Sequence, residues 1–116
     1  MHEYKCIILK VVDGDTVDVD IDLGFDVWLR GERVRIKGID APETRTRDLD
    51  EKAKGLESKA FVAEVLPVGS VQTLKTFGFK GKFGRILGDF VVYDAVTDSE
   101  MLMGSIMLRE GLASLY

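Results

Sequence analysis

The sequence predicts a small α+β domain, mainly β, built as a closed or nearly closed barrel of five short strands. Two patterns carry this prediction. Apolar and polar residues alternate over several short segments, and one segment with helical periodicity stands between the third and fourth of them. Five short strands with a helix in that position are typical of the OB barrel. We expect one such domain over residues 1–116.

The first three strands follow one another closely. Residues 4–12 are rich in Ile, Val and Leu, and in residues 17–21 apolar residues alternate with aspartates, which is the period of a half-buried strand. Gly24 begins a bend, and residues 27–36 return as a third strand. Gly31 marks a bulge or a second turn within it.

A helix is expected over residues 51–66. Asp48 and Glu51 form a capping pattern at its start, and Pro67 ends it. Its apolar residues recur at steps of three and four, which predicts one buried stripe. The stripe consists of Ala53, Leu56, Ala60, Ala63 and Leu66.

The second half of the chain predicts two strands and a short helix. Residues 71–79 and 85–93 are the strands, and a basic, glycine-rich turn joins them. Thr97 and Glu100 form a capping-box pattern, which predicts a last helix that ends near Arg109.

Composition and charge limit the classes of function. The net charge of −4 argues against a strongly basic nucleic-acid binder. The charge is uneven, however: residues 13–26 hold six aspartates and no basic residue, and residues 75–85 hold four basic residues and no acidic one. The apolar runs are too short to span a bilayer, and the N-terminus has no signal-peptide pattern. We therefore expect a cytoplasmic protein without membrane contact, with a secreted mature form left open.

Two short acidic segments are the most informative feature. Residues 13–16 read Asp-Gly-Asp-Thr and residues 39–44 read Ile-Asp-Ala-Pro-Glu-Thr, with Arg35 between them and Arg85 after them. Hard cations prefer carboxylate oxygens, and guanidinium groups bind phosphate oxygens in bidentate fashion. Each segment alone is typical of a turn. Together they predict a site that holds a hard cation beside a phosphodiester, with Asp13 assigned to turn chemistry.

With Arg109-Glu110-Gly111-Leu112-Ala113, these segments resemble the staphylococcal nuclease (thermonuclease) family, in the same order and over nearly the whole chain. The resemblance implies an OB barrel with two flanking helices, and a third, C-terminal helix truncated or absent in this chain. It also implies a Ca²⁺-dependent nuclease that hydrolyses DNA and RNA without sugar specificity and leaves 3′-phosphate ends. Single-stranded or frayed substrates and a monomer are expected.

The resemblance implies a set of metal ligands. Asp15 and Asp40 would bind Ca²⁺ through carboxylate oxygens, and Ala41 would bind it through its backbone carbonyl. Pro42 fits this role, because it biases the preceding residue toward extended geometry. Glu43 would contact the ion through water and act as the general base for the attacking water.

The resemblance also implies the groups that hold the phosphate. Arg35 and Arg85 would bind it and offset the charge that grows during attack, so they join Glu43 as catalytic residues. Lys82 and Phe83 complete the implied substrate-binding set. Phe83 stands where the family commonly has Tyr, so one hydrogen bond to a phosphate would be lost.

Two alternatives remain open from the sequence. The chain could be a non-catalytic OB module that binds nucleic acid or a protein, although all the expected acidic and arginine positions are present. The segment with Trp28, Arg30 and Arg33 could contact nucleic acid, or it could hold a packed Trp beside solvated arginines.

Overall fold

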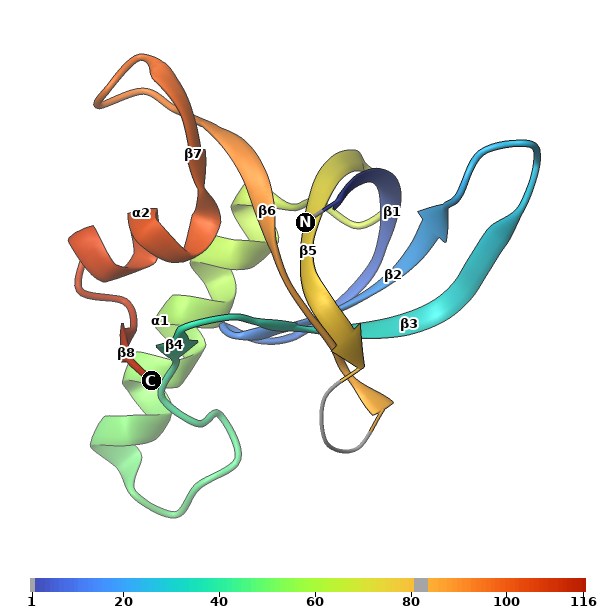
Figure 1. The fold of residues 1–116 in the computed structure, drawn as a ribbon. Coiled ribbons are helices and arrows are strands. Elements are labelled where there is room, and N and C mark those ends of the chain that lie inside the picture. Colours follow the sequence, from blue (N-terminus) through green and yellow to red (C-terminus); the bar gives the residue numbers. More distant parts are fainter. Residues whose placement is uncertain (1, 81–83) are drawn as a thin grey trace.

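Five strands close into the predicted barrel. They are β1 (His2–Asp13), β2 (Thr16–Asp22), β3 (Trp28–Ile36), β5 (Val71–Lys80) and β6 (Ile86–Asp94). The computed structural model describes residues 2–80 and 84–116. Antiparallel pairs give the order β3-β2-β1-β5-β6, and a parallel pairing of β3 with β6 closes the barrel. Figure 1 shows this barrel with both helices on one side, which confirms the predicted fold class.

Two short strands tie the C-terminal residues to the second acidic segment. β4 (Ile39–Asp40) pairs with β8 (Ser114–Leu115), and the backbone N–H of Tyr116 donates to the carbonyl of Gly38 at 3.1 Å. A further strand, β7 (Ser99–Leu102), pairs with the end of β6. Ile39 and Asp40 are therefore held in a small ladder rather than in a free loop.

The barrel interior follows the predicted alternation. In β2, Val17, Val19 and Ile21 are buried, whereas the aspartates between them are half-buried on the outer face. The interior is filled from all five strands, with Phe90 of β6 among its largest fully buried side chains. Period-two burial of this kind stabilises a closed sheet.

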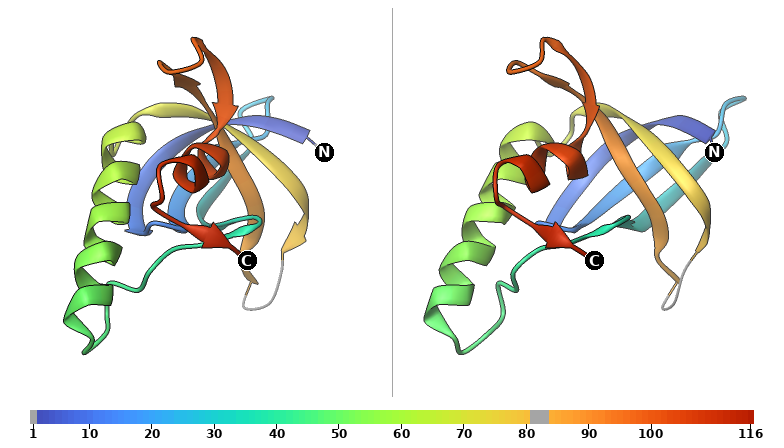
Figure 2. Two further views of the ribbon diagram at one scale, coloured as in Figure 1. Left: turned by 90° about the vertical axis from the view of Figure 1, so that its left-hand side faces the viewer. Right: turned by 60° about the vertical axis from the view of Figure 1, so that its left-hand side comes forward.

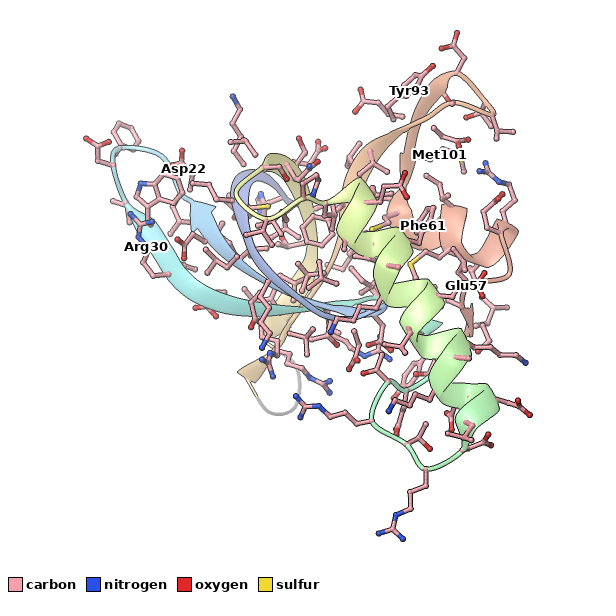
Figure 3. All side chains as sticks on the ribbon, turned by 180° about the vertical axis from the view of Figure 1, so that it is seen from behind. Asp22, Arg30, Glu57, Phe61, Tyr93 and Met101 are labelled. Atoms are coloured by element: carbon pink, nitrogen blue, oxygen red, sulfur yellow. The ribbon has the colours of Figure 1, made fainter. Side chains whose placement is uncertain are left out.

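The arginines of β3 pair with the aspartates of β2. Arg33 donates to Asp18 at 2.8 Å, and Arg30 donates to Asp20 at 3.0 Å while its guanidinium lies 4.7 Å from the centre of the Trp28 ring. Figure 3 shows Arg30 on the hairpin, far from the helices. The arginines are therefore surface residues whose charges the aspartates neutralise, and Trp28 is half-buried beside Arg30.

The first helix, α1 (Leu49–Val65), begins as predicted but buries a different face. Asp48 caps it, since its carboxylate accepts from the N–H groups of Asp50 and Glu51. The predicted stripe is wrong except at Leu66: Ala53, Leu56, Ala60 and Ala63 are exposed. The buried helix residues are Gly55, Ser58 and Val62.

Close backbone approach explains why small residues face inward. A Cβ at position 55 would lie 2.5 Å from the Glu43 carbonyl oxygen and 2.8 Å from that of Pro42. The Ser58 hydroxyl donates to the Leu112 carbonyl at 2.5 Å. The helix thus packs against the acidic segment itself, and an apolar stripe cannot reveal such a contact. Figure 2 shows α1 lying along the outside of the barrel.

The second helix, α2 (Met103–Arg109), ends where predicted but starts later. Thr97 lies in a turn and Glu100 in β7, so their capping-box prediction is wrong. The Thr97 hydroxyl instead donates to the carboxylate of Asp94 at 2.8 Å. Residues 110–116 contain no further helix. Within the described residues, neither helix is long and apolar enough to cross a membrane.

Candidate functional site

One cleft of about 440 Å³ collects the predicted site residues that the structure describes. Its walls include Asp15, Arg35, Asp40, Ala41, Glu43 and Arg85. These residues come from the turn after β1, the end of β3, the segment from β4 onward and the position directly before β6. The two remaining predicted residues, Lys82 and Phe83, lie outside the described residues.

The first acidic segment is fixed against the second one. Asp15 accepts from the Thr16 hydroxyl at 2.9 Å through one oxygen, and from the Ala41 N–H at 3.0 Å through the other. A Cβ at position 14 would lie 2.9 Å from the Cβ atoms of both Ala41 and Ser58. Glycine is therefore required at position 14 by close packing, which a plain turn would not demand.

Arg35 lies between the two carboxylates. Its Nη1 is 3.6 Å from Asp15 Oδ2, and its Nη2 is 3.4 Å from Asp40 Oδ1. Nη1 also donates to the carbonyls of Ile36 at 3.0 Å and Ile39 at 2.9 Å. The side chain is 13% exposed. The guanidinium is therefore held in place by its own chain, with one edge against the acidic pair.

Glu43 lies on a segment that is anchored on both sides. The Thr44 hydroxyl donates to Asp13 at 2.6 Å, and Gly55 of α1 packs against the carbonyls of Pro42 and Glu43. Glu43 itself is exposed in the cleft wall. A rigid backbone with an exposed carboxylate suits a group that must meet a water molecule at a fixed position.

The cleft gathers oxygen donors of the kind that a hard divalent cation prefers, although the described residues do not form a ready-made metal site. The Asp15 side chain is 13% exposed and that of Asp40 is 59% exposed, and both line the cleft together with Ala41. Over residues 2–80 and 84–116, no group of three or more His, Cys, Asp or Glu side chains is arranged to hold a metal ion. Carboxylates with a carbonyl oxygen would leave coordination positions for water and for a phosphate oxygen.

An apolar pocket of about 390 Å³ adjoins the cleft. The two share Arg35, Arg85 and Tyr116, and the pocket is also lined by residues 36–39 and by Leu87. The Arg35 guanidinium lies 5.4 Å from the centre of the Tyr116 ring. A charged cleft beside an apolar, aromatic pocket can hold a phosphate and a flat ring side by side.

The cleft wall also contains residues outside the predicted site set, among them Asp13, Arg45 and Tyr116. Tyr116 reaches the cleft through the β4–β8 ladder, which is too short for a sequence pattern to reveal. Arg45 is also in the cleft wall, and its place directly after Glu43-Thr44 in a polar segment was the available signal. Asp13, assigned to turn chemistry, lines the cleft and holds Thr44.

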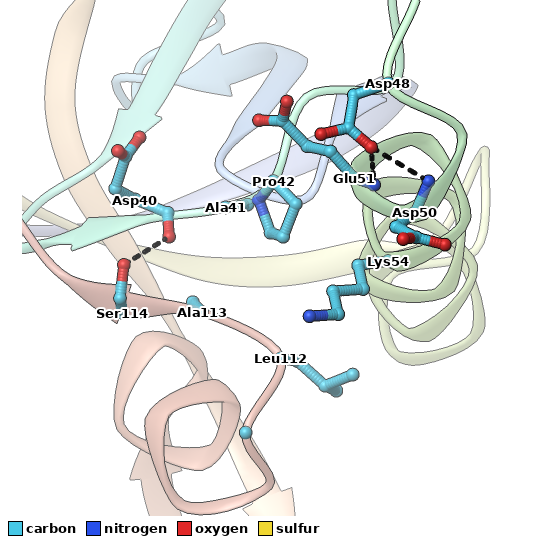
Figure 4. Close-up of a pocket in the computed structure, with 11 residues that line it drawn as sticks. Asp40, Ala41, Pro42, Asp48, Asp50, Glu51, Lys54, Leu112, Ala113 and Ser114 are labelled. Atoms are coloured by element: carbon cyan, nitrogen blue, oxygen red, sulfur yellow. Dashed lines mark hydrogen bonds between the residues drawn. The ribbon is translucent and has the colours of Figure 1, made fainter. Parts of the chain in front are cut away.

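A second cleft, of about 480 Å³, borders the same acidic segment and is a poorer match for a phosphodiester. Figure 4 shows it between Asp40 to Pro42, the start of α1 and residues 111–114. Asp48, Asp50 and Glu51 line it with a single basic side chain, Lys54. The excess of negative charge there would repel a phosphate group.

Comparisons with known proteins agree with this geometry. The model of the staphylococcal nuclease homologue family matches residues 33–116. The chain is also 30% identical over 120 residues to Endonuclease YhcR of Bacillus subtilis (strain 168), an alignment that covers 98% of this chain. The chain spans 9% of the length of that relative.

Proposed function

The chain belongs to the family of staphylococcal nuclease homologues and has a nuclease-type fold, and on that premise we propose that it is a Ca²⁺-dependent nuclease. It would hydrolyse phosphodiester bonds of DNA and RNA and leave 3′-phosphate ends. The observation that supports this proposal most is the single cleft that holds Asp15, Asp40 and Glu43 beside Arg35 and Arg85. No sugar-specific contact is required by such a site.

Asp15, Asp40 and the backbone carbonyl of Ala41 are the groups proposed to hold the cation. A bound Ca²⁺ would supply positive charge next to the phosphate. Arg35 and Arg85 bind the phosphate oxygens, for which the planar guanidinium is well suited. The Arg35 guanidinium already lies 3.4–3.6 Å from the two carboxylates, so it stands beside the acidic pair before the substrate arrives.

Glu43 accepts a proton from the attacking water in the proposed reaction. The water oxygen forms a bond to phosphorus, and the bond from phosphorus to the 5′ oxygen breaks. The phosphate then stays on the 3′ oxygen, and the 5′ oxygen leaves with the electron pair of the broken bond and takes a proton from solvent water to become a hydroxyl. Negative charge grows on the phosphate oxygens during attack, where Arg35 and Arg85 stabilise it. Removal of one such donor typically costs about 10²–10³-fold in rate.

The apolar pocket supports a preference for single-stranded or frayed substrate. Leu87 and Tyr116 border it, and Arg35 and Arg85 join it to the cleft. A base that is stacked and paired within a duplex must first be unstacked and unpaired to enter such a pocket, and this costs roughly a few kcal/mol. A base in a single strand enters without this cost.

The direct test is cleavage of single-stranded DNA, single-stranded RNA and duplex DNA in Ca²⁺, in Mg²⁺ and in chelator, with analysis of the product ends. The proposal predicts cleavage in Ca²⁺, no cleavage in chelator, 3′-phosphate ends and slower attack on the duplex. Cleavage that continues in chelator would contradict the cation requirement. Binding of all three nucleic acids without cleavage would favour the non-catalytic OB module.

A further inference from the structure

Lys37 and Phe77 lie together on the outer face of the barrel, next to the apolar pocket. The Lys37 Nζ is 4.9 Å from the centre of the Phe77 ring. Lys37 is exposed and lines the pocket, and Phe77 is half-buried. An aromatic face with a flexible cation over it is the combination that binds single-stranded nucleic acid by stacking and phosphate contact.

Strand register places this pair near Arg35, one of the two proposed catalytic arginines. Across the parallel β3–β6 pairing, Arg35 is the partner of Leu87, and the Lys37 N–H donates to the Gly88 carbonyl at 2.9 Å. Thr76, which precedes Phe77, pairs with Gly88 from the other side of β6. β6 pairs with both β3 and β5, so the three strands are neighbours in the barrel of Figure 1. Arg35, Leu87 and Phe77 therefore lie on three neighbouring strands, with Leu87 on the middle one.

Phe77 and Lys37 are not needed for core packing or for ion pairs among the described residues. Among the described residues, the barrel core and the side chains packed against it do not include Phe77. Over residues 2–80 and 84–116, no carboxylate forms an ion pair with Lys37, so its charge is available to a ligand. The pair of Arg30 and Trp28 differs, because Arg30 is already paired with Asp20.

We propose that Phe77 and Lys37 form a subsite for one further nucleotide of a single-stranded DNA or RNA substrate, beyond the nucleotide in the apolar pocket. Its base stacks on the Phe77 ring, and its phosphate contacts the Lys37 ammonium, which moves off the ring. The inference rests on the proposed function, and it predicts that substrates longer than a dinucleotide gain affinity from this pair.

The test compares Phe77→Leu, Phe77→Trp and Lys37→Gln, each in a Glu43→Gln background that keeps the probe intact. Binding of fluorescein-labelled oligothymidylates, a dinucleotide and an octanucleotide, is measured by fluorescence anisotropy in Ca²⁺ over a range of salt. Arg30→Gln is the matched control, since it removes the cation that lies over the Trp28 ring. Thermal unfolding verifies that each variant is folded.

We expect Phe77→Leu to weaken octanucleotide binding by about fivefold or more and to leave dinucleotide binding unchanged. Phe77→Trp should bind the octanucleotide at least as tightly as the parent. Lys37→Gln should reduce the slope of log affinity against log salt by about 0.7 for the octanucleotide, the value for one phosphate contact on a single strand. Arg30→Gln should change neither quantity.

Equal effects of Phe77→Leu on both lengths, or no effect on either, would overturn the inference. The cleavage assay with the unmutated chain separates this result from a failure of the proposed function. Octanucleotide binding that depends on Phe77, without any cleavage in Ca²⁺, would refute the nuclease and support the subsite. If the Glu43→Gln parent bound neither probe and the unmutated chain cleaved nothing, both the subsite and the proposed function would be refuted.

Discussion

The hydroxyl of Thr44 donates a 2.6 Å hydrogen bond to the carboxylate of Asp13, and this contact joins the two acidic segments across 31 positions of sequence. It sits directly after Glu43, the proposed general base. The close packing of Gly14 on Ala41 fixes the same two segments a few residues away. The site is therefore built by one segment resting on the other.

Thr44→Val should lower kcat by a larger factor than it raises KM. The substitution removes the donor to Asp13 while it keeps the size and shape of the side chain, so the Glu43 segment loses one anchor. We expect the free energy of unfolding to fall by about 1 kcal/mol. Steady-state kinetics and urea unfolding measure the two effects. Thr44→Ser retains the hydroxyl and should behave as the parent chain. Equal kinetics for the Val and Ser variants would contradict an anchoring role of the Thr44 hydroxyl.

Gly55→Ala should destabilise the protein, although the same change inside a helix normally stabilises it by about 0.5–1 kcal/mol. The added Cβ would lie 2.5 Å from the Glu43 carbonyl oxygen, so α1 or the Glu43 segment must move. Thermal unfolding and the cleavage rate should both decline. Ala60→Gly, at an exposed position of the same helix, is the control and should cost only the ordinary propensity difference. A stabilised Gly55→Ala would contradict the close contact.

The barrel could be predicted from sequence because its strands carry a local signal. Apolar and polar residues alternate in β2, and the helix start is marked by Asp48, whose capping bonds the structure confirms. Both features depend on residues that are neighbours in the chain. The order of the acidic segments and arginines likewise indicated which residues meet in the cleft, while their roles in metal binding and catalysis stay predictions.

The errors have a common physical cause, which is contact between distant segments. The inward face of α1 is set by the backbone of Glu43, so Gly55 and Ser58 are buried in place of the alanines. The start of α2 was placed too early because the Thr97 hydroxyl is used by Asp94. Tyr116 reaches the cleft through a ladder of two residues on each side. The hydrophobic periodicity of a sequence does not reveal contacts between distant segments.

Asp89 should give the protein a pH-dependent stability of unusual sign. Burial raises the pKa of its carboxyl to about 6, although the N–H groups of Phe90 and Gly104 donate to it. The ordinary pKa of an aspartate in an unfolded chain is about 3.9. The folded state therefore holds an extra proton between about pH 4 and pH 6, and the stability contributed by this group falls as the pH rises through that window.

Comparison with Asp89→Asn isolates this effect, since the amide oxygen can still accept both hydrogen bonds. The difference in unfolding free energy, parent minus variant, should decrease by ~2–3 kcal/mol from pH 4 to pH 7 and then stay level. Urea unfolding at a series of pH values gives this curve. A difference that is constant with pH would show that the carboxyl titrates as it does in the unfolded chain.

Arg35→Lys should damage both stability and catalysis. The guanidinium donates to the carbonyls of Ile36 and Ile39 and also faces Asp15 and Asp40, which a single ammonium group cannot reproduce. We expect kcat/KM to fall by about 10²–10³-fold and the unfolding free energy to fall by about 1–3 kcal/mol.

Arg33→Lys is the control for that substitution. Arg33 lies on the same strand, pairs with Asp18 on the outer face and is outside the cleft, so its replacement should leave the kinetics unchanged. If the two lysine variants behaved alike, the assignment of Arg35 to the site would be wrong.

The most direct measurement of the central claim is the initial rate of single-stranded DNA cleavage in Ca²⁺ by the parent chain, Glu43→Gln and Glu57→Gln, purified in parallel. Glu57 is an exposed residue of α1 that does not line the cleft. The account predicts a loss of about 10²–10⁴-fold for Glu43→Gln and an unchanged rate for Glu57→Gln. Equal rates for all three proteins would contradict it, because cleavage would then not depend on the proposed general base.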